Sequence, residues 1–423
     1  MAASGRGQNI TEYPVPTPSS QLRGITKGPD GNVWFTEQLG KKIGRITPQG
    51  VITEFAIPEA PGQPTSPNAI TLGPDGNVWF ADFRSVGRIT PSGTITRFFN
   101  LPSLSLTGQG ITGGPDGNVW FTLSASDHPR IGQIKPNGDI VEFPVLGATG
   151  LQDITSGPDG NLWFTDSLGK QIGRMTTAGS VTLFPTPVEV TGPQGIAPGP
   201  DGNLWFTSAF HLGRITTAGV FTIFPDPGGD APRGITAGPD GNMWYVETSG
   251  NNIGRITTNG VMTEFRPPTV TSGPFDIAPG SDGALWFTES GGNKIGRIAP
   301  ASLYTLTPCR VLDTRGAPGP LGGPALEAGK TRNFVLVGRC GIPESVSAVA
   351  LNVTVTQPTA AGDLRLFPAG AFLPLVSTIN YRAGQTRANN AVVGLGGSGD
   401  LGVRCDQASG SVHMIVDVNG YFR

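Results

Sequence analysis

Short apolar stretches recur at a regular interval between residues 9 and 300 of the chain. In the fullest copy, apolar and aromatic runs fall within Leu22–Glu37, Ile43–Thr47 and Gly50–Phe55, and Gly, Pro, Asp and Asn separate them. Each copy holds one tryptophan at the same place, and the successive separations are 45, 41, 43, 42, 39 and 42 residues. A period of about 42 residues is typical of the four-stranded blades of a β-propeller. The tryptophans are Trp34, Trp79, Trp120, Trp163, Trp205, Trp244 and Trp286.

The residue types within one copy predict four short strands. Gly-Ile-Thr is apolar, Val-Trp-Phe-Thr is aromatic and β-branched, Ile-Gly-Arg-Ile-Thr follows, and Ile-Thr-Glu-Phe alternates apolar with polar residues. Gly-Pro-Asp-Gly-Asn, between the first two, has turn chemistry, because Pro presets φ while Asp and Gly accept the turn geometry. We therefore expect an all-β chain in which residues 9–302 form a seven-bladed β-propeller.

The two ends of the repeat array complement each other. The seventh copy runs from Pro274 through Ile298 and lacks a fourth strand, whereas Asn9–Pro14 matches the Ile-Thr-Glu-Phe strand. The N-terminal strand is therefore expected to complete the last blade and close the ring, which removes exposed strand edges. An open solenoid is the alternative, and it leaves the split blade unexplained. Residues 1–8 are expected to be disordered or an addition made for expression.

The repeat is absent from residues 303–423. Four short apolar runs, separated by Gly, Pro and Asn, predict a second all-β domain of the β-sandwich type without helices. These runs are Ala348–Val355, Leu364–Phe367, Val392–Leu395 and Met414–Val418.

All three cysteines of the chain, Cys309, Cys340 and Cys405, lie in this second domain. An odd number indicates one disulfide and one free thiol, and the sequence leaves the pairing open. A disulfide would suit a small domain outside the cell. The spacing of the cysteines fits no zinc motif.

Composition and charge narrow the classes of function. Only 14% of the residues are charged and the formal net charge is −2, which argues against nucleic acid as a partner. No window approaches 18 apolar residues, so no membrane span is predicted. Met1–Arg6 lacks the apolar region of a signal peptide. Either the protein is cytosolic or a leader has been removed, and we favour removal.

The propeller repeat resembles the streptogramin B lyase (virginiamycin B lyase) family over roughly residues 9–300. The resemblance rests on Gly-Pro-Asp-Gly-Asn-Val/Leu-Trp-Phe-Thr-Glu and on Lys-Ile-Gly-Arg-Ile-Thr, as at Lys42–Thr47 and Lys294–Arg297. It implies the propeller fold and, for active members, the opening of a cyclic depsipeptide antibiotic by β-elimination with magnesium. That chemistry needs a base for the proton α to a carbonyl and a cation for the developing enolate.

The resemblance also indicates where the family's catalytic groups would stand. In the family, Pro-His-Ala/Gly-Ile motifs open the last two full repeats, one Glu precedes the second motif, and another ends the Trp-Phe strand. Here the motifs carry Arg233 and Phe275 in place of histidine, and Gly273 in place of the first Glu. Only Glu289 matches, as the one family position left to hold a metal. Because Arg and Phe cannot act as a base near pH 7, no catalytic residue is assigned and no cofactor beyond the family's magnesium is expected.

Three histidines remain as substitutes for the missing base. They are His128 in an insertion of the third copy, His211 after the fifth Trp-Phe strand, and His413 in the second domain. No two share a motif, so isolated surface histidines are the simpler interpretation.

Repeat-equivalent residues lie on equivalent parts of a ring, so two sets are expected to line one mouth and bind a polar ligand. The first set precedes or occupies the Gly-Ile step: Arg23, Asn68, Gln109, Gln152, Gln194, Arg233 and Phe275. The second set ends the Trp-Phe-Thr strand: Glu37, Asp82, Leu123, Asp166, Ser208, Glu247 and Glu289. Amides, guanidiniums and carboxylates together would suit a glycan, a peptide or a cation.

A structural role is the alternative for the acids of the second set. In that interpretation they pair with the recurring arginines and join neighbouring blades. The arginines are Arg45, Arg88, Arg174, Arg214, Arg255 and Arg297. The Asp of each Asp-Gly turn is expected to be structural, because the turn alone explains it.

The second domain resembles a module found at the ends of many bacterial secreted proteins. The resemblance rests on Thr307–Arg315 and on Val416–Phe422. It favours an extracellular or cell-surface location, with a glycan, a peptide or a cell-surface component as partner.

Three functions follow as hypotheses. The first is a non-catalytic recognition propeller. The second is a magnesium-dependent carbon-oxygen lyase with a site rearranged around Glu37, Glu247 and Glu289. The third is a structural or adhesive protein that forms oligomers or filaments.

Overall fold

The computed structural model describes residues 3–4, 10–99, 106–124, 129–226, 228, 230–299, 303–344 and 346–422. Every regular element in these ranges is a β-strand, so they contain no helix able to cross a membrane. The predicted all-β fold is confirmed. The described residues divide into two compact units, one ending at Ala299 and the other beginning at Leu303.

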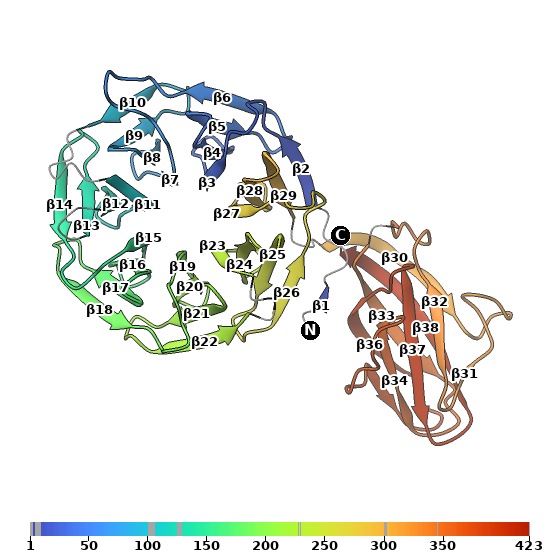
Figure 1. Cartoon of the computed structure of the whole chain (residues 1–423). Coiled ribbons are helices and arrows are strands. Elements are labelled where there is room, and N and C mark those ends of the chain that lie inside the picture. Colours follow the sequence, from blue (N-terminus) through green and yellow to red (C-terminus); the bar gives the residue numbers. More distant parts are fainter. Residues whose placement is uncertain are drawn as a thin grey trace. The chain divides into compact units, whose positions relative to one another are not determined.

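Seven four-stranded antiparallel blades form the first unit, and they follow one another around a ring in chain order (Figure 1). Blade 1 contains β3 (Leu22–Lys27), β4 (Val33–Glu37), β5 (Lys42–Ile46) and β6 (Ile52–Ala56). Blade 2 contains β7 (Ile70–Leu72), β8 (Val78–Asp82), β9 (Ser85–Ile89) and β10 (Ile95–Phe98). Blade 3 contains β11 (Leu106–Gly113), β12 (Val119–Ser124), β13 (Arg130–Ile134) and β14 (Ile140–Pro144).

The remaining blades repeat this order of strands. Blade 4 contains β15 (Leu151–Ser156), β16 (Leu162–Asp166), β17 (Gln171–Met175) and β18 (Val181–Pro185). Blade 5 contains β19 (Ile196–Pro198), β20 (Leu204–Ser208), β21 (His211–Ile215) and β22 (Phe221–Pro225). Blade 6 contains β23 (Pro232–Ala237), β24 (Met243–Glu247), β25 (Asn252–Ile256) and β26 (Met262–Phe265).

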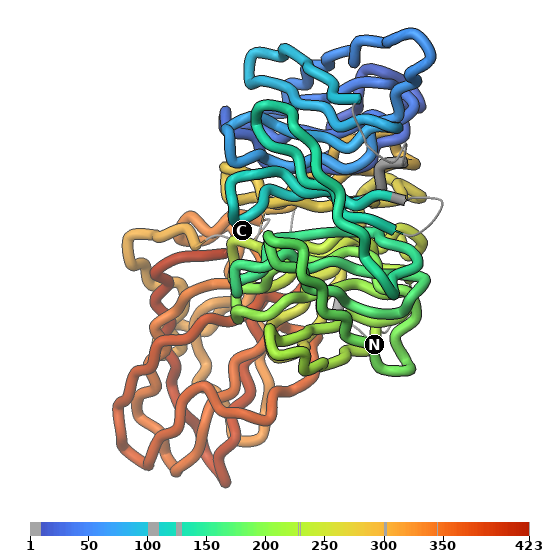
Figure 2. The backbone as a smooth tube through the Cα atoms, turned by 90° about the vertical axis from the view of Figure 1, so that its left-hand side faces the viewer, coloured from blue at the N-terminus to red at the C-terminus, as the bar shows by residue number. Residues whose placement is uncertain are grey.

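Blade 7 is assembled from both ends of the propeller sequence. It joins β27 (Pro274–Pro279), β28 (Leu285–Glu289) and β29 (Lys294–Ile298) to the N-terminal β2 (Ile10–Pro14). The antiparallel register of β2 on β29 runs from Ile10 opposite Ile298 to Pro14 opposite Lys294. Side and top views both place blade 7 (yellow) beside blade 1 (blue) (Figures 1 and 2).

One short strand lies within residues 1–8, most of which fall outside the described residues. β1 (Ala3–Ser4) pairs in parallel with β26, with Ala3 opposite Thr263 and Ser4 opposite Glu264. Strand pairing depends on backbone groups, so the hydrophobic pattern of the sequence gave no indication of it.

Every blade is built around its tryptophan. The seven indoles are at most 1% exposed, and each stacks on an aromatic ring of the outermost strand, as Trp34 does on Phe55 with ring centroids 5.5 Å apart. The indole Nε1 donates to the Asp of the preceding turn, for example from Trp34 to Asp30 over 3.0 Å. The Gly after that Asp takes a positive φ, such as 78° at Gly31, which confirms the predicted turn.

Neighbouring inner strands approach closely enough to require glycine. A Cβ added at Gly195 would lie 2.4 Å from the backbone oxygen of Arg233 in the next blade. Backbone cannot move aside as a flexible side chain can, so the residue after each mouth position is small in most blades.

The second unit contains two antiparallel sheets that share one hydrophobic core. The first contains β30 (Leu303–Asp313), β38 (Ser411–Phe422), β33 (Ala348–Thr356) and β36 (Arg387–Gly394), and β31 (Leu326–Glu327) pairs with β38. The second contains β32 (Thr331–Val335), β37 (Asp400–Gln407), β34 (Gly362–Pro368) and β35 (Ile379–Tyr381). Several strands are longer than their apolar runs predicted, because the pairing continues through polar residues.

The structure settles the pairing of the cysteines. Cys309 and Cys340 form a disulfide with Cα atoms 5.8 Å apart, whereas Cys405 is a buried free thiol. The thiol of Cys405 packs in the core of the second unit, and burial raises its pKa. It is therefore an inert core residue rather than a reactive one.

The acid of a blade turn should contribute measurably to stability. Asp159 accepts hydrogen bonds from Trp163 Nε1 at 2.9 Å and from the Asn161 side chain at 2.8 Å. We expect Asp159→Ala to lower the free energy of unfolding by about 1–3 kcal/mol, because it leaves the indole N–H unpaired. All seven tryptophans lie in the propeller, so urea titration followed by tryptophan fluorescence monitors that unit.

Asp139→Ala is the matched control. Asp139 is an exposed turn acid that accepts hydrogen bonds only locally, from Asn137. We expect this change to cost less than about 0.5 kcal/mol. Equal losses in the two variants would contradict the structural role of the turn acid.

Candidate functional site

The starts of the innermost strands surround a cavity on the axis of the ring (Figure 1). Its volume is about 120 Å³. Five residues of the first predicted set line it: Asn68, Gln152, Gln194, Arg233 and Phe275. Arg23 contacts this group through Phe275, and the side chain of Gln109, in β11, lies outside the described residues.

An aromatic ring between two guanidiniums forms one side of this mouth. The Arg23 guanidinium carbon lies 4.4 Å from the centroid of the Phe275 ring, and that of Arg233 lies 5.0 Å from it. The three side chains come from blades 1, 7 and 6, so the arrangement spans three consecutive blades. Burial, followed by the charge of Arg233, lowers the pKa of Arg23. The two guanidiniums bring positive charge to this side of the mouth.

Two carboxylates that the sequence analysis did not select also line the cavity, Asp153 and Asp276. Each stands where most other blades have glycine, and each accepts a backbone hydrogen bond from the next blade, at Ile196 N and Ile25 N, both over 3.0 Å. Burial raises the pKa of Asp153 to about 7 and that of Asp276 to about 6. Aligning the repeats and looking for an acid at the glycine position would have found both.

The predicted second set does not line this cavity, which corrects the expectation of a shared mouth. Its members end the second strand of each blade, and their side chains are fully buried away from solvent. The buried polar members are Glu37, Asp82, Asp166, Ser208, Glu247 and Glu289, and Leu123 is the apolar one. Their equivalent positions in the repeat predicted the end of the blade at which they lie. These positions did not predict the direction in which the side chains point.

Each buried acid has its own local partners. Asp82 forms an ion pair with Arg97 at 2.7 Å, and Asp166 accepts backbone hydrogen bonds from Thr149 and Gly150. In blade 1, Glu37 lies near Lys42 and Glu54, and the two latter residues form an ion pair at 2.6 Å.

Blade 7 repeats the arrangement of blade 1. Glu289 lies near Lys294 and Glu12, which form an ion pair at 2.7 Å. Burial, followed by the charge of Glu12, raises the pKa of Glu289 to about 8. Burial and the charge of Glu54 likewise raise the pKa of Glu37 to about 7.

The recurring arginines pair with the turn acids and not with the strand-end acids. Arg214 lies 3.1 Å from Asp201 and also donates to the carbonyl of Thr258 in the next blade at 3.1 Å. Arg45 pairs with Asp30 at 3.4 Å and donates to Pro91 of blade 2 at 3.0 Å. These arginines therefore do join neighbouring blades, although through different partners from those expected.

The two histidines among the described residues lie in different units of the chain. His211 begins β21 in the propeller, and His413 contacts the Thr314 carbonyl in the second unit at 2.9 Å. His128 lies outside the described residues.

Comparison with known proteins identifies this scaffold. The profile of the virginiamycin B lyase family matches residues 3–150 and 128–317, which is more than half of the chain. The chain belongs to the virginiamycin B lyase family. Curated relatives share shorter segments with it. Virginiamycin B lyase from Bordetella bronchiseptica is 46% identical over 57 residues, which is 14% of this chain and 19% of the length of that relative.

Solved structures extend the similarity to the whole propeller. A streptogramin B lyase structure has 32% identity and a TM-score of 0.64, covering 70% of this chain and 99% of that one. A catalytically inactive histidine-to-alanine variant of virginiamycin B lyase from Staphylococcus aureus, with quinupristin, has 34% identity and a TM-score of 0.64 over 69% of this chain and 99% of that one. The WD40 propeller of Doa1, at 11% identity and a TM-score of 0.57, shares the fold alone.

The residues at the family's catalytic positions do not fit the magnesium that virginiamycin B lyase chemistry implies. Arg233 and Phe275 offer no ligand atom, and they stack on each other in the mouth. Glu289 is fully buried and is the one carboxylate at these positions, so they offer a single protein ligand. No step of the family's reaction is therefore derived for this chain.

The raised pKa of Glu289 predicts that stability falls as the pH rises from about 4.5 to about 8. The ordinary value for Glu289 is 4.5, so above that pH the unfolded chain releases a proton that the folded chain keeps until about pH 8. Stability from this group is complete below pH 4.5 and is lost as the pH rises toward 8. We expect Glu289→Gln, which cannot ionise, to gain about 2–4 °C in Tm relative to the unmodified protein between pH 5 and pH 8.

Tm followed by tryptophan fluorescence across this pH range measures the effect. Glu189→Gln serves as the control, because Glu189 is an exposed acid of the connection between blades 4 and 5. Parallel Tm curves for the unmodified protein and Glu289→Gln would show that Glu289 is ionised at neutral pH.

Proposed function

We propose that this protein is a secreted, non-catalytic member of the virginiamycin B lyase family that binds a polar ligand, a glycan or a peptide, at its central mouth. The observation that carries the proposal is the Arg23–Phe275–Arg233 stack, in which Arg233 and Phe275 occupy the two positions where the family resemblance places histidines. Neither Arg nor Phe can take a proton from carbon near pH 7. The same residues are well suited to bind a ligand, because the aromatic ring supplies a stacking surface and the two guanidiniums supply directed hydrogen bonds.

The opposite side of the mouth supports a polar ligand. Asn68, Gln152 and Gln194 line it with amide groups that donate and accept hydrogen bonds. A ligand with hydroxyl or amide groups on one side and a carboxylate on the other would match both sides of the mouth. Acidic oligosaccharides and peptides with a free carboxylate have this chemistry.

An extracellular or cell-surface location is part of the proposal. The disulfide between Cys309 and Cys340 supports it, since disulfides persist in oxidising compartments. The resemblance of Thr307–Arg315 to a module of secreted proteins points the same way. A cell-surface component is then the natural source of the ligand.

Loss of Arg233 should weaken ligand binding. Full-length protein is applied to glycan and peptide arrays, and the dissociation constant of the best ligand is then measured for Arg233→Ala. We expect about tenfold weaker binding, because the guanidinium supplies a charge-assisted contact. Arg382→Ala, which removes an exposed arginine of the second unit, should leave the dissociation constant unchanged. If no array ligand binds, or if Arg233→Ala leaves the dissociation constant unchanged, ligand binding at the mouth is contradicted.

The lyase alternative is favoured by family membership and by the match at Glu289. We expect incubation with quinupristin and MgCl2 to give no linear product above a protein-free blank by mass spectrometry. Turnover that Glu289→Gln abolishes would establish the lyase and overturn the non-catalytic proposal.

A further inference from the structure

Blade 6 departs from the repeat at several positions that face one spot between blades 5 and 6. Tyr245 replaces the phenylalanine of the other six blades and lies opposite Gly254, which in turn lies opposite Glu264 on the outer strand. Two residues further along, Glu247 lies opposite Asn252. Because side chains alternate along a strand, these residues share one face of the sheet.

A third acid approaches this face from the connection between the two blades. Asp226 follows β22, and its backbone N–H donates to the Phe210 carbonyl over 3.0 Å. Val15, Ile57 and Val145 make the same backbone bond after other outer strands, and all three are buried apolar residues. Asp226 is also buried, at 8% exposure. The connection from blade 5 to blade 6 therefore places an acid where three other connections place a hydrophobic side chain and the connection after blade 4 places Thr186.

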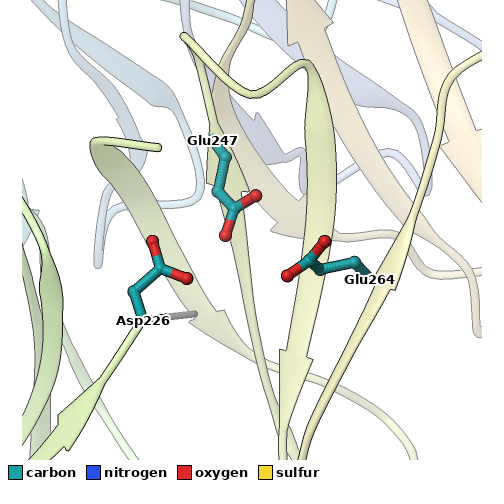
Figure 3. Close-up of side chains that lie close together, drawn as sticks. All are labelled: Asp226, Glu247 and Glu264. Carbon is teal, nitrogen blue, oxygen red and sulfur yellow. The ribbon is translucent and has the colours of Figure 1, made fainter. Parts of the chain in front are cut away.

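The three carboxylates converge. One oxygen each from Asp226, Glu247 and Glu264 lie within 4.8 Å of one another, and the side chains point toward a common centre (Figure 3). Glu247 is 0% exposed. Burial, followed by the charge of Asp226, raises the pKa of Glu247 to about 8.

Blades 1 and 7 show how the same face is neutralised elsewhere in the ring. In blade 1 the ammonium of Lys42 donates to Glu54 and to Thr17, both at 2.6 Å. In blade 7, Lys294 donates to Glu12 at 2.7 Å and contacts Thr269 in the same way. The chain thus places a cation beside these buried acids in both blades.

Blade 6 has Asn252 at the lysine position. Its Nδ2 donates to Glu247 at 3.0 Å and to Glu264 at 3.3 Å, which satisfies hydrogen bonds but supplies no charge. The ion pairs of the described residues include none with these three acids, and the charge of Arg266 acts only on Glu264, whose pKa stays raised by burial. The acid count has risen from two to three, while the compensating cation is absent from the sequence at that position.

Unpartnered oxygens also converge here. The Tyr245 hydroxyl, Asn252 Oδ1 and Glu247 Oε1 are buried and have no hydrogen-bond partner among the described residues. Tyr245 is 0% exposed and Asn252 is 2% exposed. The ring of Tyr245 lies over Gly254, whose cross-strand neighbour is Glu264, so the hydroxyl belongs to the sheet face that carries the acids. An unpaired buried polar group costs free energy unless a ligand satisfies it.

We propose that blade 6 binds a calcium ion between Asp226, Glu247 and Glu264, with Asn252 Oδ1 and the Tyr245 hydroxyl completing an oxygen-only site. The ion occupies the role that the lysine ammonium has in blades 1 and 7. The site is separate from the mouth and from the family's catalytic positions, and it does not depend on the mouth binding a ligand.

The donor set favours calcium over magnesium. Calcium accepts six to eight oxygens at about 2.3–2.6 Å in flexible geometry, so opposite ligands lie up to about 5 Å apart, which fits the 4.8 Å spread. Magnesium requires a tighter octahedron and retains several waters, which leaves fewer positions for the five protein oxygens. Calcium would also fix the connection after blade 5, because Asp226 accepts backbone hydrogen bonds from Gly228 and Asp230.

Calcium binding is tested by calorimetry and by Tm on full-length protein freed of metal with EDTA and desalted. We expect saturable binding of one ion and a rise in Tm of about 5 °C at a calcium concentration near 100-fold above the dissociation constant. Magnesium at the same concentration should produce a smaller rise. Absence of a calcium-dependent shift, or a larger shift with magnesium, overturns the proposal.

Two variants restore the repeat and assign the site. Asp226→Val introduces the residue found at Val15 and Val145, and Asn252→Lys introduces the ammonium of blades 1 and 7. Both should fold and lose at least tenfold in calcium affinity, and Asn252→Lys should reach a high Tm without calcium. Glu37→Gln, the blade 1 counterpart of Glu247, should bind calcium as the unmodified protein does. Calcium binding that survives both repeat-restoring variants places the ion elsewhere and contradicts the site.

Discussion

The buried indole of each blade packs against the next blade, and this contact holds the ring together. Trp34 of blade 1 packs against Ile70, Val78 and Phe80 of blade 2, and the other blades repeat the contact. Its N–H is fixed by the turn acid, and the arginine that pairs with that acid lies over the indole face. The turn acid, the indole and the guanidinium thus form one set of contacts in each blade. Blade 3 has Gln133 in place of the arginine and keeps the hydrogen bond to its turn acid at 2.8 Å.

This set of contacts leaves the sequence of two regions in each blade free to vary. The start of each inner strand faces the axis. Arg, Asn, Gln and Phe alternate there from blade to blade without disturbing the packing of the indoles. The end of each second strand is buried between blades, where acids must be neutralised locally. Blade 2 uses Arg97, blades 1 and 7 use lysine, and blade 4 uses backbone N–H groups. Sequence differences between the blades therefore mark the positions that the shared packing of the ring does not require.

The period of the tryptophans was sufficient to predict the propeller, because one supersecondary unit repeated seven times has few other ways to bury its apolar face. The pairing of β2 with β29 corresponds to the missing fourth strand of the last copy. Five residues of the first set line the cavity, since their positions follow from the strand order, whereas ligand binding by them stays a prediction. The strand-end acids were misplaced, because the direction of a side chain depends on packing that the repeat does not reveal. Asp153, Asp276 and Asp226 were missed, although each is a departure from the repeat that an alignment of the seven copies displays.

The divided seventh blade also determines how the propeller would respond to mechanical load. Ile10 lies opposite Ile298, so the N-terminal strand begins beside the point where the chain leaves the ring. Tension applied between the two ends of the propeller would act on these hydrogen bonds one pair after another, as in the opening of a zipper. Strands pulled in shear instead share the load across all their bonds. The ring is therefore closed against thermal opening by a complete blade, yet it would open at low force at this one junction.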